Sequence, residues 1–177
     1  MNTTSKMLML ATLLVALSGC GGDPAPGEGR KVDASGKESA PLESLPAEVL
    51  AAAQTAQPDL AISEAEYETR DGNEYYDVGG TLPDGSELEL DMTKIDGVWT
   101  VVETQRDIGM DLLPGKVADA LASKFPEWQA RRIIESDQGD GVVIYEFFGK
   151  GDAGDDIKIE IKWEQGHAEL LLDEWQH

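Results

Sequence analysis

Few residues in this chain are suited to nucleophilic or redox chemistry, because its 177 residues include only one cysteine and two histidines. The cysteine, Cys20, follows the sequence Leu-Ser-Gly near the N-terminus. His167 lies beside a glycine turn, and His177 is the last residue of the sequence. A serine or cysteine nucleophile needs a base held within hydrogen-bond reach, and neither histidine occupies a position that would hold it firmly. We therefore predict that the protein is not an enzyme and that it has no cofactor.

Acidic turns are the strongest hint of a metal site in the sequence. Asp152, Asp155 and Asp156 fall within the stretch Gly-Asp-Ala-Gly-Asp-Asp, and a second acidic stretch covers 137–141. Calcium takes six or more oxygen ligands, often from a flexible turn, but neither stretch has the ligand spacing of an EF-hand loop. We expect plain hairpin turns here, with calcium binding through these three aspartates as the alternative.

The overall charge excludes one class of partner. The chain has 14 Lys and Arg against 35 Asp and Glu, which gives a formal net charge of -21. A polyphosphate backbone would be repelled, since nucleic-acid binding depends on clustered basic residues. We predict no nucleic-acid partner.

Residues 1–19 have the features of a secretory signal peptide. Lys6 precedes an uncharged apolar run from Met7 to Leu17, and two small residues follow this run. The run is shorter than the roughly 20 apolar residues that a membrane-spanning helix needs. The segment therefore predicts export.

The sequence Leu-Ser-Gly-Cys at 17–20 resembles the lipobox of bacterial lipoproteins, in which the cysteine is acylated and becomes the first residue after cleavage. This resemblance implies that Cys20 carries acyl chains such as palmitate, and that this lipid alone holds the protein on the membrane of the cell envelope. Gly21, where an aspartate would retain such proteins at the inner membrane, implies the outer membrane, facing the periplasm. An ordinary secretory signal with an unmodified cysteine is the alternative.

Residues 20–43 are expected to form a disordered tether. They are rich in Gly, Pro, Ser and charged residues and nearly lack apolar ones, so they bury too little surface to fold.

Two segments follow in which the same residue types recur at matching positions, and we predict repeats at 44–107 and 108–177. Ten residues recur in the same order, five of them 68 residues apart and five 69 residues apart, and such self-similarity indicates repeated units. The matching residues are Leu45, Pro46, Val49, Ala52, Pro58, Asp71, Gly72, Tyr76, Gly85 and Gly97, and then Leu113, Pro114, Val117, Ala120, Pro126, Asp140, Gly141, Tyr145, Gly154 and Gly166.

In each segment the spacing of the apolar residues changes once, from that of a helix to that of strands. Apolar residues at helical spacing follow Pro46 and Pro114, which suit the start of a helix, and later residues alternate with period two, as in strands with one buried face. The last strand of the first unit is expected at 98–104, and the first strand of the second unit at 130–136. We predict an α+β fold of two tandem units, each one helix followed by a four-stranded antiparallel β-meander, with the helix packed on one sheet face.

This order of motifs resembles the PepSY family and its PepSY-like relatives, including the β-lactamase inhibitor protein. The motifs are Leu-Pro-x-x-Val-x-x-Ala, a proline, a glycine turn, Tyr-Asp-Val or Tyr-Glu-Phe, and a strand that in the first unit reads Glu-Leu-Glu-Leu. The resemblance implies a non-catalytic protein-binding module that inhibits or regulates an extracytoplasmic hydrolase. The alternative is an envelope protein that binds or senses a divalent cation such as calcium.

Strand alternation also predicts which residues face away from the helices. In the first unit these include Tyr75 and several carboxylates, and in the second unit they include Ile144 and Phe148. If exposed, Tyr75, Ile144 and Phe148 are the candidate anchors for an unknown envelope or secreted protein. The alternative is that the two units bury them against one another. We expect the protein to be a monomer. The acidic members of this face are Asp77, Glu87, Glu89 and Asp91, then Glu146 and Glu160 beside Lys158 and Lys162.

Overall fold

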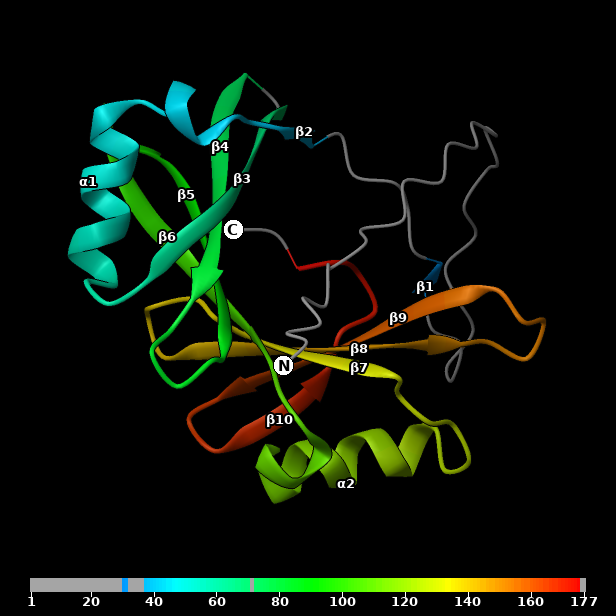
Figure 1. Cartoon of the computed structure of the whole chain (residues 1–177). Coiled ribbons are helices and arrows are strands. Elements are labelled where there is room, and N and C mark those ends of the chain that lie inside the picture. Colours follow the sequence, from blue (N-terminus) through cyan, green and yellow to red (C-terminus); the bar gives the residue numbers. More distant parts are fainter. Residues whose placement is uncertain (1–29, 32–36, 71, 176–177) are drawn as a thin grey trace, which may run out of the picture.

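The computed structural model describes residues 30–31, 37–70 and 72–175. These residues form ten strands, two α-helices and two short 3-10 helices, and each α-helix is followed by four consecutive strands (Figure 1). In chain order the elements are β1 (Arg30–Lys31), β2 (Glu38–Ser39), η1 (Leu42–Ser44), α1 (Ala47–Ala56), β3 (Ala61–Arg70), β4 (Asn73–Thr81), β5 (Glu87–Ile95), β6 (Val98–Asp107), η2 (Met110–Leu112), α2 (Gly115–Lys124), β7 (Arg132–Asp137), β8 (Val142–Lys150), β9 (Asp156–Glu164) and β10 (His167–Leu170).

All ten strands belong to one antiparallel sheet. Its order is β1-β9-β8-β7-β6-β5-β4-β3-β2, with β10 also paired to β9. The prediction of an α+β fold made of two units, each a helix with its own four-stranded meander, is therefore wrong. Over the described residues the protein is mostly β, with 49% strand and 19% helix, and the strands form a single sheet.

The pairing of β6 with β7 joins the strands into this one sheet. Thr104 to Asp107 of β6 pair with Ile134 to Asp137 of β7, so β6 continues three residues beyond the strand end expected at 104. The residues 105–107 are polar and do not show a strand pattern. Ion pairs between neighbouring strands hold them, namely Arg106 with Glu135 at 2.6 Å and Arg132 with Asp107 at 2.8 Å.

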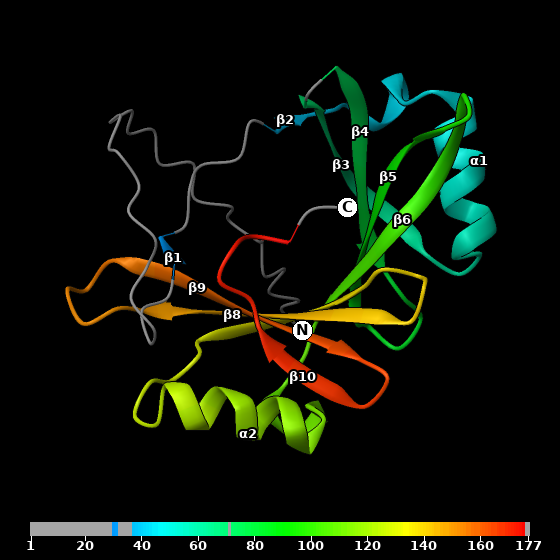
Figure 2. The ribbon, with the colours of Figure 1, turned by 180° about the vertical axis from the view of Figure 1, so that it is seen from behind.

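The sheet bends between β6 and β7, and both helices lie on its outer side (Figures 1 and 2). On α1, Val49 and Ala53 pack into one apolar core with residues of β4, β5 and β6. On α2, Val117 and Leu121 pack into a second core with residues of β7, β8 and β9. Because each helix covers the outer face of its own half, the opposite faces of both halves meet on the inner side of the bend.

Chain segments at both ends of the fold contribute to this inner side. The C-terminal residues return over it, where Trp175 donates its backbone N–H to Glu160 Oε2 at 3.0 Å and its indole N–H to Gln138 Oε1 at 2.9 Å. At the N-terminal end, β1 pairs with β9 and β2 with β3, at opposite ends of the sheet. Glu38 is only seven positions after Lys31, a reach of at most about 25 Å, so the two ends of the sheet curve toward each other.

The expected tether at 20–43 differs from the structure where it is described. Residues 30–31 and 38–39 are strands, and η1 begins at Leu42. The signal peptide at 1–19 and Cys20 lie outside the described residues. Among the residues that are described, no helix is both long enough and apolar enough to cross a membrane.

Candidate metal centre

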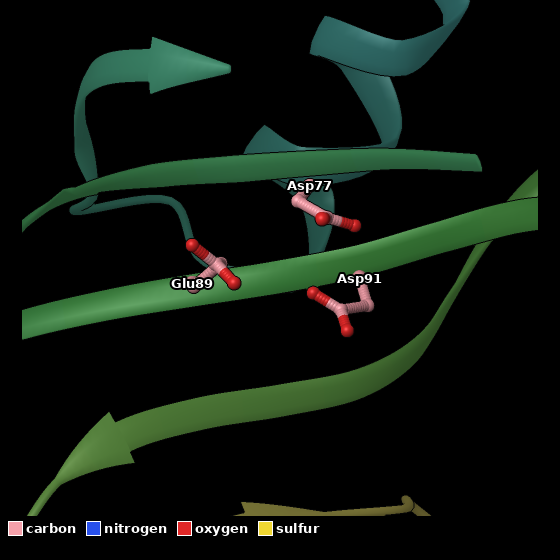
Figure 3. Close-up of side chains that lie close together, drawn as sticks. All are labelled: Asp77, Glu89 and Asp91. Atoms are coloured by element: carbon pink, nitrogen blue, oxygen red, sulfur yellow. The ribbon is translucent and has the colours of Figure 1, made fainter. Parts of the chain in front are cut away.

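Three carboxylates from two neighbouring strands meet on the inner face of the first half. Asp77 of β4 and Asp91 of β5 are register partners, and Glu89 of β5 lies opposite Gly79. Since residues two apart in a strand share a face, all three side chains project to the same side (Figure 3). One oxygen from each lies within 4.8 Å of the others. We refer to Asp77, Glu89 and Asp91 as the carboxylate cluster.

Two members of the cluster are buried, and buried carboxylates ordinarily need a partner. Asp77 is 5% and Asp91 6% exposed. Asp91 Oδ2 accepts a hydrogen bond from Gln105 Nε2 at 3.1 Å, whereas Asp91 Oδ1 has no hydrogen-bond donor among the described residues. Leaving a buried polar oxygen without a partner is unfavourable by an amount comparable to a lost hydrogen bond or more. This oxygen is therefore positioned to accept a ligand.

Glu103 of β6 extends the row of acids but is already engaged. It is the register partner of Asp91, next to a β-bulge in the β5–β6 pair. Its Oε1 accepts hydrogen bonds from Gln105 Nε2 at 2.9 Å and from the Ser136 hydroxyl of β7. Glu103 therefore connects the cluster to the β6–β7 junction, and it is not one of the three carboxylates that lie close enough to share an ion.

The pKa values show how much negative charge is crowded here. Burial, reinforced by Asp77, raises the pKa of Glu89 to about 7, and Lys37 opposes this rise. Burial and then the charge of Asp77 raise the pKa of Asp91 well above its usual value. For Lys37 burial favours the neutral amine, but the charges of Asp77 and Asp91 outweigh it and raise its pKa. Among the described residues, the Lys37 ammonium thus does not offset the effect of burial and of neighbouring carboxylates on Glu89 and Asp91.

The second half of the sheet offers an internal comparison. There Glu146 of β8 and Glu160 of β9 are register partners, as Asp77 and Asp91 are in the first half. Lys158 stands two residues before Glu160, in the place that Glu89 has before Asp91. Its ammonium lies 3.1 Å from Glu146, 2.9 Å from Glu160 and 2.6 Å from Glu174. The second acidic pair thus has a cation on its own strand, and the first has a third carboxylate instead.

The two halves also differ in what covers this position. Phe148 is the register partner of Lys158, whereas Gly79 is the register partner of Glu89. A side chain at Gly79 would collide with Glu64, whose Cγ lies 2.9 Å from the place of a Cβ. Without one, a shallow cleft reaches Glu89. It is lined by residues of β3 to β7, among them Glu64, Gly79, Glu89, Gln105 and Arg132.

This arrangement suits a hard divalent cation. Carboxylate oxygens are the ligands of calcium and magnesium. Two oxygens that both bind calcium at about 2.4 Å lie at most about 4.8 Å apart, and the three cluster oxygens lie within that limit. Main-chain, amide or water oxygens would complete the coordination shell of six or more.

The residues predicted as a metal site from the sequence alone lie elsewhere. Asp152, Asp155 and Asp156 belong to the hairpin between β8 and β9, where Gly151 N–H donates to the carbonyl of Asp155 at 2.9 Å. Asp156 pairs with Lys150 at 2.6 Å. Across the described part of the chain, the carboxylate cluster is the group of three or more ligands that lies close enough to share an ion, and the hairpin is not.

The predicted partner anchors are mostly inaccessible. Tyr75 is 9% and Ile144 1% exposed, and Phe148 is half-buried with the Arg132 guanidinium 5.9 Å from its ring centre. The alternation placed them on the face turned away from the helices, and of the two alternatives, exposure or burial, Tyr75 and Ile144 are buried. His167, in β10, lines a separate shallow pocket with Lys162 and Glu169, and His177 lies outside the described residues.

Comparison with known proteins identifies no family. No protein-family model matches the sequence, and no curated protein matches it, so the PepSY resemblance stays a prediction. One solved structure is similar, that of a protein from Bacteroides vulgatus assigned to the DUF2874 family and described as periplasmic. It shares 22% identity, with 78% of this chain and 97% of that chain covered, at a TM-score of 0.29.

Proposed function

We propose that this protein binds a divalent cation of the calcium type through Asp77, Glu89 and Asp91. The observation that carries the proposal is the buried Asp91, whose Oδ1 lacks a donor among the described residues and which offers a carboxylate oxygen within 4.8 Å of oxygens from Asp77 and Glu89. The comparison with Lys158 supports it, because the equivalent acidic pair of the second half has an ammonium on its own strand, at the position that Glu89 has in the first half.

The proposal includes a location. The signal peptide at 1–19 and the lipobox at Cys20 support an exported protein that is anchored by lipid in the cell envelope, with Gly21 favouring the outer membrane. With a lipid anchor of several acyl chains the attachment is lasting, and the protein samples the cation concentration of the periplasm without catalysing a reaction.

Calorimetric titration with calcium chloride tests the cation site. The chain from residue 20 onward is used, with Cys20→Ser so that no lipid is attached. We expect saturable binding of one ion and a rise in melting temperature. A ligand at 100 times its Kd adds about 2.7 kcal/mol to the free energy of unfolding, or roughly 5 to 10 °C for a chain of this size. No binding heat and an unchanged melting temperature at millimolar calcium would contradict the proposal.

Two variants make the test specific to the cluster. Glu89→Lys reproduces the arrangement of Lys158 and is expected to abolish calcium binding while the protein stays folded. The matched control is Asp152→Asn with Asp155→Asn, which removes two charges from the hairpin and is expected to leave binding unchanged. Loss of binding in the hairpin variant alone would instead support the calcium site that the sequence suggested.

A protein-binding role is the second candidate, and the edge strand β3 favours it. Over the described residues, the outer edge of β3 pairs with β2 through Tyr67 and Glu66, whereas β3 itself runs from Ala61 to Arg70. An exposed strand edge accepts an added strand from a partner. Immobilised protein should then retain a specific envelope protein, such as a hydrolase, and retention of none at moderate salt would count against this role.

A further inference from the structure

We infer that Lys37 is a built-in counter-ion of the carboxylate cluster, which a divalent cation displaces, so that cation binding releases strand β2 from the edge of the sheet. This inference rests on the proposed cation site and names what regulates it.

Lys37 forms an ion pair with the acidic group of the first half, as Lys158 does with that of the second half. Its ammonium forms an ion pair with Asp77 Oδ2. Its positive charge also attracts the carboxylates of Asp91 and Glu89, and that of Glu66 in β3. Lys37 is half-buried and reaches the cluster from the residue before β2. The counter-ion of the carboxylate cluster thus comes from a segment outside β4 and β5, the two strands that carry the cluster.

Lys37 and a bound cation exclude each other. Asp77 Oδ2 holds the ammonium, and the same carboxylate is one of the three ligands. A divalent ion coordinated by the cluster would lie within a few Å of the ammonium, and two cations repel strongly at that distance in a partly buried site. Occupation of the site therefore requires the Lys37 side chain to leave.

The attachment of β2 is weak enough for this exchange to release it. The strand has two exposed residues, Glu38 and Ser39, which pair with Tyr67 and Glu66. One further backbone bond follows, from Ala40 N–H to the carbonyl of Ala65 at 2.8 Å. Lys158 differs, because it lies inside the nine-residue strand β9, which pairs with β8 along its length. The second half therefore keeps its counter-ion, whereas the first can exchange it.

The released segment lies between the predicted anchor and the first helix. Lys37 follows Cys20, the predicted site of acylation, by 17 residues (37 minus 20). The chain between them includes β1, which stays paired with β9. Release of β2 therefore leaves η1, which begins at Leu42, as the next attached element after β1, and it uncovers the edge of β3 at Tyr67 and Glu66.

Lys37→Met in the chain from residue 20 onward, again with Cys20→Ser, tests the exchange by calcium titration. If Lys37 competes with calcium, its removal tightens binding, and we expect a decrease in Kd of about tenfold, within the usual range for coupled sites. The matched control is Lys94→Met, which removes an exposed lysine of β5 that pairs with Glu74, and no change in Kd is expected. Amide hydrogen exchange of the protein with Lys37 intact should accelerate at residues 38–40 when calcium is added.

The outcomes separate this inference from the proposed function. If neither protein binds calcium, the cation site itself is wrong. If both bind it with the same Kd, or if Lys37→Met binds more weakly, the site stands and the exchange is refuted. If the variant binds more tightly but exchange at 38–40 does not change with calcium, Lys37 leaves without releasing β2, and the release is refuted.

Discussion

Replacing Glu89 with glutamine is expected to stabilise the cation-free protein at pH 8 and to have little effect at pH 4.5. The pKa of Glu89 is about 7 in the folded protein, against an ordinary 4.5. Between these values the folded state binds more protons than the unfolded state, so the free energy of unfolding falls as the pH rises through this range. Glutamine does not ionise, so the variant lacks this fall.

The size of the effect follows from the same two values. The difference of 2.5 between about 7 and 4.5, at 1.36 kcal/mol for each pKa unit, corresponds to about 3 kcal/mol when the side chain is fully ionised. Because Glu89 is partly exposed at the cleft, we expect about 2 kcal/mol at pH 8. This corresponds to a melting temperature roughly 4 to 8 °C higher.

Urea unfolding followed by tryptophan fluorescence, with EDTA present, measures this difference from pH 4.5 to pH 8. The matched control is Glu87→Gln, which removes the same charge from an exposed position of the same strand and should change stability little. The explanation is refuted if Glu89→Gln gives no gain at pH 8, an equal gain at pH 4.5, or the same gain as Glu87→Gln.

Two further changes test the packing of the inner face and of β3 against β4. Lys158→Met leaves Glu146 and Glu160 without their shared ammonium, and the loss of one partner from a buried ionic group should lower the free energy of unfolding by about 3 to 5 kcal/mol. Urea unfolding measures it, and a loss below about 1 kcal/mol would contradict the role of Lys158. Gly80→Ala should lower the melting temperature by several degrees, because its Cβ would lie 2.4 Å from the backbone oxygen of Ala61. A variant with an unchanged melting temperature would show that β3 shifts freely at this point.

Local patterns predicted the elements well because they depend on neighbours within the chain. The helices start after Pro46 and Pro114, as the sequence indicated. The glycine turns at Gly97 and Gly166 have positive φ, which a two-residue hairpin turn requires and glycine permits. Alternation also placed Asp77, Glu89 and Asp91 on one face, but it did not indicate that Asp77 and Asp91 are buried there.

The sequence by itself thus determined where helices, strands and turns form, and which side of each strand is acidic. Only the tertiary structure decided that β6 pairs with β7, that this makes one bent sheet, and that the bend buries Asp77 and Asp91. It also decided that Lys37, far from them in the chain, supplies their positive charge. The physical reason is that periodicity reports the two faces of one strand, whereas burial and charge balance depend on lateral pairing and curvature, to which distant residues contribute.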